Sequence, residues 1–277
     1  MGRVRVITDS SACVPAELVA KFAVCVLPIS VFLPEDSLTG IDPTDGGEMP
    51  LPEALAREEL AGANHPFVTE YLQAIESPDF DAAVVITPAV EFATMYRNAA
   101  LAAEFALRPV VLVDARTAAA GQALVVLAGA EAAAAGAEIQ QVVRIVEQAS
   151  SRVELVASLA TLEPIRRSGP LPDDVLGDLE PSGVRNVFRM RDGTVEPLGT
   201  APTPEEMLEA IHAAYLSSAP RGSERSAVFH ANAPHLAARL GELLGGVDFV
   251  SGFSVAMQVH TGSGVVGAAW IPVGAAP

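Results

Sequence analysis

Short runs of Val, Ile and Ala alternate with helical patterns through the first half of the chain, and this alternation restricts the fold more than any other feature. The strand candidates are Val4–Thr8, Val24–Val31, Ala82–Thr87 and Pro109–Asp114. Helical spacing is found in Phe92–Leu107 and Ala118–Gly136. Strands that are apolar along their whole length suit a parallel sheet covered by helices on both faces. We therefore expect an α/β fold.

The pattern changes after about residue 152. The strand candidates of this half are Val153–Ser158, Val187–Arg191, Thr194–Leu198, Ser226–Ala231, Phe249–His260 and Val265–Val273. Asp192-Gly193 between two of them predicts a hairpin, and the capping box at Thr203–Glu206 predicts a helix to about residue 217. We predict two domains: residues 1–155, an N-terminal α/β domain with a parallel sheet, and residues 156–277, a C-terminal α/β domain with a largely antiparallel sheet.

Composition excludes several classes of partner. Acidic residues outnumber basic ones by 34 to 17, and the resulting net charge of -17 repels nucleic acid and anionic membrane surfaces. The apolar stretch 118–137 contains Gln122 and Glu131, which favours a buried helix over a transmembrane segment. Asp9 interrupts the first apolar run too early for a signal-peptide core, so we expect a cytoplasmic protein.

No motif predicts a metal or a cofactor. Cys13, Cys25 and the five histidines lack the spacing of a metal site. Gly262–Gly267 has the letters of a dinucleotide fingerprint, but only ten residues follow Gly267, too few for the helix and acidic residue that this site requires. These glycines instead predict a bend or a close approach of the backbone to a neighbour.

Polar residues gather in turn-like segments that could form a site. Asp9-Ser10-Ser11 follows the first strand, where it can either cap a helix or bind an anion. His65 and His260 lie in segments marked by proline or glycine, and polar side chains converge on sites more often there. Neither histidine has a Gly-x-Ser-x-Gly elbow beside it, so a nucleophile-based hydrolase lacks its signature.

Several segments, taken in order, resemble the DegV family of bacterial fatty-acid-binding proteins, which includes the acyl-carrying subunit of bacterial fatty acid kinase. They are Val6–Ser11 with Val14-Pro15, Val26–Ile29, Val113-Asp114, Leu159–Gly169 and His260–Gly267. The last is similar to the family pattern His-x-Gly-Pro-Gly. The resemblance implies two α/β domains, a long-chain fatty acid or related lipid whose tail is buried, a carboxylate at the domain junction, and a fatty acid kinase as a partner.

The chain departs from the family pattern where hydroxyl donors are expected. Ala63–Pro66 stands where members carry Thr-Ser-x-Pro, and residues 89–96 lack most of the family's serines. A buried carboxylate without donors is costly, so other residues must replace them or the ligand has changed. By this alignment the ligand-binding candidates are Asn64, His65, Thr87, Thr94, Arg166, His260 and Thr261.

The leading hypothesis is a non-catalytic lipid-binding protein. A second hypothesis is an enzyme that acts on a small anion or transfers a phosphoryl group, using the Asp9–Ser11 segment and Arg166. A third is an interaction protein that has kept the fold and lost the ligand, in which case side chains would fill the cavity.

Overall fold

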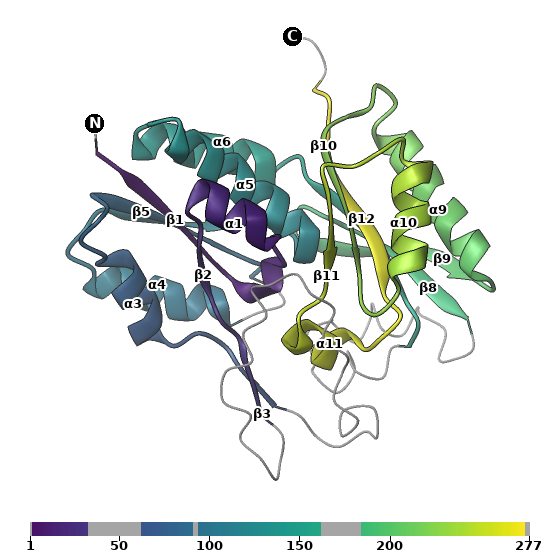
Figure 1. The fold of residues 1–277 in the computed structure, drawn as a ribbon, viewed down its shortest axis with the longest axis horizontal. Coiled ribbons are helices and arrows are strands. Elements are labelled where there is room, and N and C mark those ends of the chain that lie inside the picture. The colour runs from purple at the N-terminus through teal and green to yellow at the C-terminus, as the bar shows by residue number, and fades with distance from the viewer. Residues whose placement is uncertain (1, 33–61, 91–93, 162–183, 275–277) are drawn as a thin grey trace.

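Two β-sheets carry the fold, and one long helix lies between them (Figure 1). The computed structural model describes residues 2–32, 62–90, 94–161 and 184–274. The first sheet belongs to the N-terminal half of the chain and the second to the C-terminal half, as Figure 1 shows by its colours.

The N-terminal sheet is parallel throughout. Its strands are β1 (Val4–Asp9), β2 (Cys25–Leu27), β5 (Ala82–Thr87) and β6 (Val110–Asp114), in the order β2-β1-β5-β6. All six residues of β5 are buried. The continuous apolar runs therefore predicted this sheet correctly, because a central parallel strand has helices on both of its faces.

Helices cover the two faces of this sheet according to the alternation of side chains along each strand. Val84 and Ile86 of β5 pack with α5 (Ala119–Ala134) and α6 (Ile139–Ser150). Ala83 and Val85 pack with α3 (Val68–Ile75) and α4 (Met95–Phe105) on the opposite face. A short helix, α1 (Ala16–Phe22), contacts α5.

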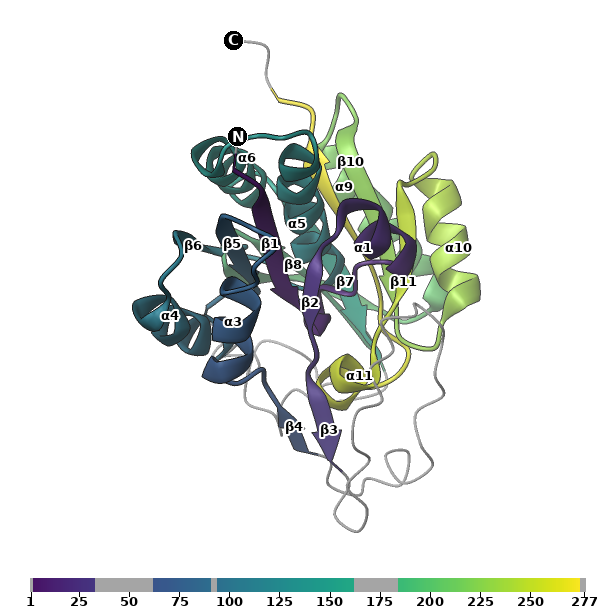
Figure 2. The same cartoon turned by 60° about the vertical axis from the view of Figure 1, so that its left-hand side comes forward.

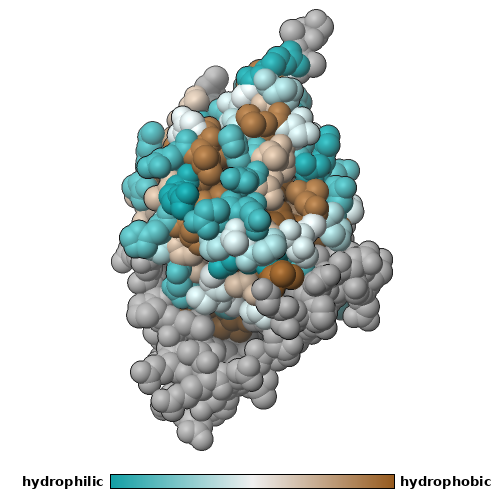
Figure 3. Space-filling view, turned by 90° about the vertical axis from the view of Figure 1, so that its right-hand side faces the viewer, coloured by the Kyte–Doolittle hydropathy of each residue, from teal (hydrophilic) through white to brown (hydrophobic). Residues whose placement is uncertain are grey.

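The C-terminal sheet is mixed and mostly antiparallel. Its strands are β7 (Glu154–Leu159), β8 (Arg185–Arg191), β9 (Thr194–Ala201), β10 (Ser223–His230), β11 (Phe249–Gly252) and β12 (Val266–Pro272). Their order is β11-β10-β12-β7-β8-β9, and only β10 and β11 pair in parallel. Helices α9 (Pro204–Ser218) and α10 (Pro234–Leu243) cover the outer face, away from α5 (Figure 1). Figure 2 shows α10 on the side of β11 that faces away from α5. Hydrophobic residues on this side lie in small groups among hydrophilic ones (Figure 3).

Two predictions from local sequence signals are confirmed by the structure. Asp192 and Gly193 have φ of 51° and 77°, the positive values that a tight hairpin turn requires. At the start of α9, the Glu206 amide donates to Thr203 Oγ1 at 3.2 Å and the Thr203 amide donates to Glu206 Oε2 at 3.1 Å. This reciprocal pair is the predicted capping box.

Three segments differ from the sequence predictions. The predicted strand Phe249–His260 is wrong after Gly252, because the Ser254 hydroxyl accepts the Met257 amide at 3.3 Å and begins helix α11 (Val255–Thr261). The predicted strand Val24–Val31 is divided at Pro28 into β2 and β3 (Ser30–Phe32), and β3 pairs with β4 (Gly62–Asn64). Helix α6 was not predicted, although its apolar residues follow helical spacing.

Helix α5 is the predicted buried helix at 118–136. Its residues from Ala119 to Leu127 are all buried, and it contacts β1 and β5 of one sheet and β10 and β12 of the other. Gly129 lets α6 approach, since a Cβ at this position would lie 2.5 Å from Val146 Cγ2. Within the described part of the chain, no helix is both long and apolar enough to cross a membrane.

Gly267 provides the close approach that the glycine-rich segment predicted. It lies in β12 between Phe229 of β10 and Ala157 of β7. A Cβ at residue 267 would lie 2.4 Å from Phe229 Cζ and 2.8 Å from Ala157 Cβ. Only a residue without a side chain therefore allows the Phe229 ring to cross β12.

We predict that Gly267→Ala lowers the free energy of unfolding by about 1–3 kcal/mol, because the Phe229 ring must move or the strands must separate. Gly241→Ala in α10 is the control, since its Cβ would be 3.7 Å from Val247 Cγ2, an ordinary contact distance. Alanine there removes the ~1 kcal/mol cost of a helical glycine. Urea unfolding measures both. A Gly267→Ala protein as stable as the wild type would contradict the argument.

A buried polar network joins the end of β1 to α5. Asp9 caps the 3₁₀-helix η1 (Ser10–Ala12), accepting the Ser11 amide at 3.0 Å and the Ser11 hydroxyl. Gln122 of α5 donates to Thr8 Oγ1 at 3.0 Å and to Asp9 Oδ2 at 3.4 Å. Burial raises the pKa of Asp9, and the hydrogen bonds from Ser11 and Gln122 only partly oppose it.

The raised pKa of Asp9 gives a testable pH dependence. A carboxyl whose folded pKa exceeds its unfolded pKa adds stability below the unfolded value, and this contribution is lost as the pH rises through the folded value. Each unit of elevation corresponds to ~1.4 kcal/mol. We expect Asp9→Asn to gain stability relative to the wild type as the pH rises from about 4 toward neutral, because only the wild type has a buried carboxyl that must ionise. Urea unfolding measures the stability of both proteins across this range. A constant difference between wild type and Asp9→Asn at every pH would contradict the expectation.

Candidate functional site

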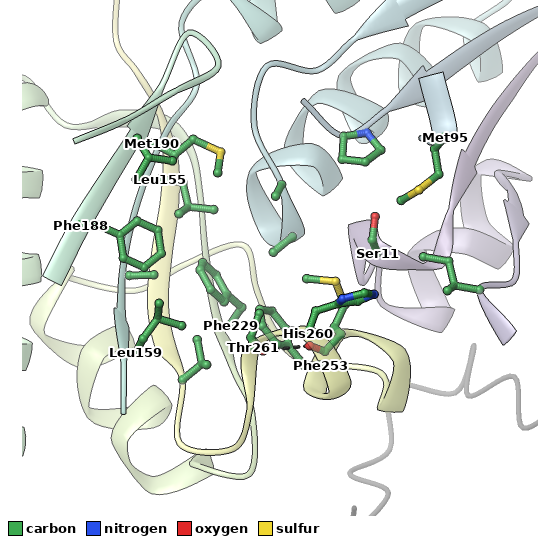
Figure 4. Close-up of a pocket in the computed structure, with 18 of the residues that line it drawn as sticks. Ser11, Met95, Leu155, Leu159, Phe188, Met190, Phe229, Phe253, His260 and Thr261 are labelled. Carbon is green, nitrogen blue, oxygen red and sulfur yellow. Dashed lines mark hydrogen bonds between the residues drawn. The ribbon is translucent and has the colours of Figure 1, made fainter. Parts of the chain in front are cut away.

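A cavity of about 210 Å³ lies between the inner face of the C-terminal sheet and the N-terminal half (Figure 4). Its walls come from both halves of the chain. The lining residues of the N-terminal half are Ser11, Ile29, His65, Pro88, Met95, Ala118 and Ala119. Those of the C-terminal half are Leu155, Ala157, Leu159, Phe188, Met190, Val195, Phe229, Phe253, Met257, His260, Thr261 and Val265.

Most of the cavity surface is apolar because alternate residues of the C-terminal strands point inward. Leu155, Ala157 and Leu159 lie on one face of β7 and line the cavity. The Phe229 and Phe253 rings stack with centroids 5.3 Å apart and planes 8° apart. Such walls suit a hydrocarbon chain and offer few hydrogen-bond partners.

Polar groups are concentrated at one end of the cavity. The rings of His65, which follows β4, and His260, which lies on α11, stack with centroids 6.3 Å apart and planes 11° apart. Ser11 and Thr261 line the same cavity. Figure 4 shows Ser11, Met95 and His260 away from Met190 and Leu155, which belong to the sheet wall.

Both imidazoles are held in the neutral form more strongly than in water. Burial lowers the pKa of His65. Burial also lowers the pKa of His260, and the charge of protonated His65 lowers it further. His65 Nδ1 is buried and has no hydrogen-bond partner among the described residues. Neutral imidazoles can donate or accept one hydrogen bond at each nitrogen, so this pair can receive a polar head group.

Hydrogen bonds within the C-terminal half fix α11 and therefore His260. Gln258 Nε2 donates to the Phe253 carbonyl at 3.0 Å, and Asn232 Nδ2 donates to Gln258 Oε1 at 2.8 Å. The Thr261 hydroxyl donates to the Met257 carbonyl at 2.9 Å, and Thr261 lines the cavity. These bonds hold the wall of the cavity that carries His260.

The residues predicted for the site separate into two groups. His65, His260 and Thr261 line the cavity together. Asn64 is exposed at the end of β4, and Thr94 is exposed just before α4. Thr87 is completely buried at the end of β5, and neither it nor Asn64 nor Thr94 lines the cavity. Arg166 lies outside the described residues.

The sequence prediction did not include the apolar walls or Ser11 as part of a lipid site. Ser11 had a signal, since it follows the first strand in a polar segment. The sequence also carried a signal for Phe188 and Met190, because these residues alternate with polar residues along a predicted strand. That alternation does not reveal which face of a two-sided sheet lines a cavity and which packs against helices.

The segment Asp9–Ser11 does not present a free anion site. The Ser11 amide already donates a hydrogen bond to the Asp9 carboxylate, and α1 begins only at Ala16. Burial raises the pKa of the Cys13 thiol to about 12 and also raises that of Cys25, so both thiols are protonated at neutral pH. Among the described residues, no group of three or more His, Cys, Asp or Glu could hold a metal ion.

Curated relatives of similar length resemble the chain. A DegV domain-containing protein of Streptomyces coelicolor is 26% identical over 274 residues, covering 95% of this chain and 96% of the relative. A DegV domain-containing protein of Mycobacterium tuberculosis is 31% identical over 166 residues, covering 59% of this chain and 58% of the relative.

Solved structures have the same fold. A DegV family protein from Thermus thermophilus, described as binding fatty acid, superposes with a TM-score of 0.85 at 21% identity, covering 98% of this chain and 100% of that one. DegV from Bacillus subtilis, described as a fatty acid binding protein, gives a TM-score of 0.84 at 22% identity, covering 98% and 99%.

One family model matches nearly the whole sequence. It is described as "Uncharacterised protein, DegV family", and the match covers residues 3–273, which include both sheets and all the residues that line the cavity. This chain therefore belongs to the DegV family.

Proposed function

We propose that this protein binds a long-chain fatty acid or a similar lipid without transforming it, with the tail in the cavity and the head group at His65 and His260. The observation that carries the proposal is the asymmetry of the cavity: apolar walls over most of its length and two stacked imidazoles at one end. A ligand with the same asymmetry is an acyl chain with one polar end.

The tail supplies most of the affinity in this proposal. Each buried methylene is worth ~0.8 kcal/mol, so about 15 of them would give at most ~12 kcal/mol before ordering and desolvation costs. The head group adds orientation. A carboxylate buried next to hydrogen-bond donors avoids the cost of an unpaired charge, and the two imidazoles can replace the hydroxyls that this chain lacks.

The family relatives support a lipid ligand. The proteins from Thermus thermophilus and Bacillus subtilis, whose folds match this chain over 98% of its length, are described as binding fatty acid. Presentation of the bound lipid to a fatty acid kinase remains a prediction from family resemblance, and Arg166, the cation expected near the head group, lies outside the described residues.

The other two hypotheses have less support. The phosphoryl-transfer hypothesis needs a free helix start at residues 9–11, but these residues bond to each other. The hypothesis of a lost ligand requires side chains to fill the interior, whereas about 210 Å³ lies open.

The first test asks whether the purified protein carries or takes up lipid. We expect native mass spectrometry of the recombinant protein to show an acyl ligand, and lipid extraction to identify it. Adding fatty acid to delipidated protein should stabilise it by about 2.7 kcal/mol at a hundredfold excess over the dissociation constant. Inorganic phosphate is the control for the enzyme hypothesis. Stabilisation by phosphate and not by fatty acid would reverse the ranking.

The second test concerns the histidine pair. We expect His65→Phe and His260→Phe each to weaken fatty acid binding by about tenfold, because each removes one hydrogen-bonding ring worth ~1.4 kcal/mol. Binding of the methyl ester should change less, since it carries no charge. His235→Phe, at an exposed position on α10, is the control.

The same pair predicts a pH dependence. Burial keeps the pKa of both imidazoles below the ordinary value, and a bound carboxylate raises the pKa of a neighbouring imidazole. Fatty acid binding should therefore strengthen as the pH falls from about 7 to about 5.5, and this gain should be smaller in His65→Phe. Calorimetric titrations with equal pH profiles for the two proteins would argue against a head group at this pair.

A further inference from the structure

The β8–β9 hairpin contributes to the end of the cavity opposite the histidines. The sheet order places β9 at the edge farthest from β11, the strand that leads into α11 and His260. Met190 of β8 and Val195 of β9 pair across this hairpin, and both line the cavity. Figure 4 shows Met190 and Leu155 together on the side away from Ser11 and Met95.

Met190 and Val195 form a closed wall. They are only 6% and 8% exposed, although the residues on either side of Val195, Thr194 and Glu196, are exposed. This difference follows from the strand alternation, which turns Val195 inward and its two neighbours outward. The far end of the cavity is therefore limited by two side chains of defined volume.

The tip of the hairpin is also joined to the N-terminal half. The Gly193 amide donates to the Arg116 carbonyl at 2.8 Å, and the Arg116 guanidinium pairs with the Asp192 carboxylate. Arg116 lies two residues before Ala118, which is one of the cavity-lining residues of the N-terminal half. The ion pair is about half exposed and contributes little to stability, so the backbone hydrogen bond and the tight turn are what hold the hairpin tip to the N-terminal half.

We propose that the β8–β9 hairpin, fixed to Arg116 at its tip, is the stop that sets the acyl chain length of the bound lipid, with Met190 and Val195 as the specificity-determining residues. This inference rests on the proposed lipid-binding function. A chain anchored by its head at His65 and His260 can extend only until its terminal methyl group meets these two side chains. Longer chains must then displace packed side chains or bend.

The experiment compares dissociation constants for dodecanoic, tetradecanoic, hexadecanoic and octadecanoic acids. Val195→Phe reduces the room at the far end and should shift the preference toward shorter chains. Val195→Ala enlarges it and should shift the preference toward longer ones. We expect the ratio of affinities for dodecanoic and octadecanoic acids to change by at least about tenfold between the two variants, because a few methylenes gain or lose their contacts.

Glu196→Phe is the matched control. It adds the same ring at the neighbouring position, on the outward face of β9, and should leave the chain-length ranking unchanged. Thermal unfolding checks that each variant is folded. If Val195→Phe fails to fold, Val195→Ala with Met190→Ala still tests the proposal from the enlarged side.

The outcomes separate this inference from the proposed function. A wild-type protein that binds none of the four acids would remove the proposed function and this inference with it. A wild-type protein that binds them, with the same ranking in both Val195 variants, would overturn the hairpin stop alone. A shift in opposite directions for Phe and Ala would support it.

Discussion

The burial of helix α5 between two sheets is the constraint on which the rest of the structure depends. Residues from Ala119 to Leu127 are buried on all sides, so the helix can exist only if both sheets are folded against it. Small side chains make this possible. The two halves of the chain therefore share one apolar core, in which Val84 of the first sheet and Ala269 of the second belong to the same cluster.

The cavity follows from this arrangement. Where α5 begins, at Ala118 and Ala119, its small side chains do not fill the space between the sheet wall and the loops of the N-terminal half. Strand alternation supplies apolar side chains from the C-terminal sheet, while the polar residues come from segments outside it, such as His65 after β4 and Ser11 in η1. The chemical asymmetry of the cavity thus has a topological origin.

Electrostatics reinforces this asymmetry. Burial holds His65 and His260 toward the neutral form, and it raises the pKa of Asp9, whose carboxyl is occupied by Ser11 and Gln122. A fixed positive charge is therefore absent from the cavity lining given by the described residues. In the proposed function, the head group meets imidazoles that are held toward the neutral form in the free protein and that gain a proton more readily once a carboxylate is bound, which makes binding sensitive to pH near the physiological range.

The sequence by itself determined the elements whose causes are local. Apolar runs such as Ala82–Thr87 predicted the parallel strands, Asp192-Gly193 the hairpin, and Thr203–Glu206 the start of α9. The sequence also indicated that the glycine-rich segment Gly262–Gly267 bends or approaches a neighbour closely, and the close approach is found at Gly267. Local signals failed at Phe249–His260, because an apolar run is compatible with a strand or a short helix until a cap such as Ser254 decides.

Only the tertiary structure decided that His65 and His260, 195 positions apart by their numbers in the chain, stack against each other, whereas Asn64 and Thr94 lie outside the cavity. The physical reason is that these positions depend on how β4 and α11 are brought together by the packing of both sheets around α5, which no local pattern of residues encodes.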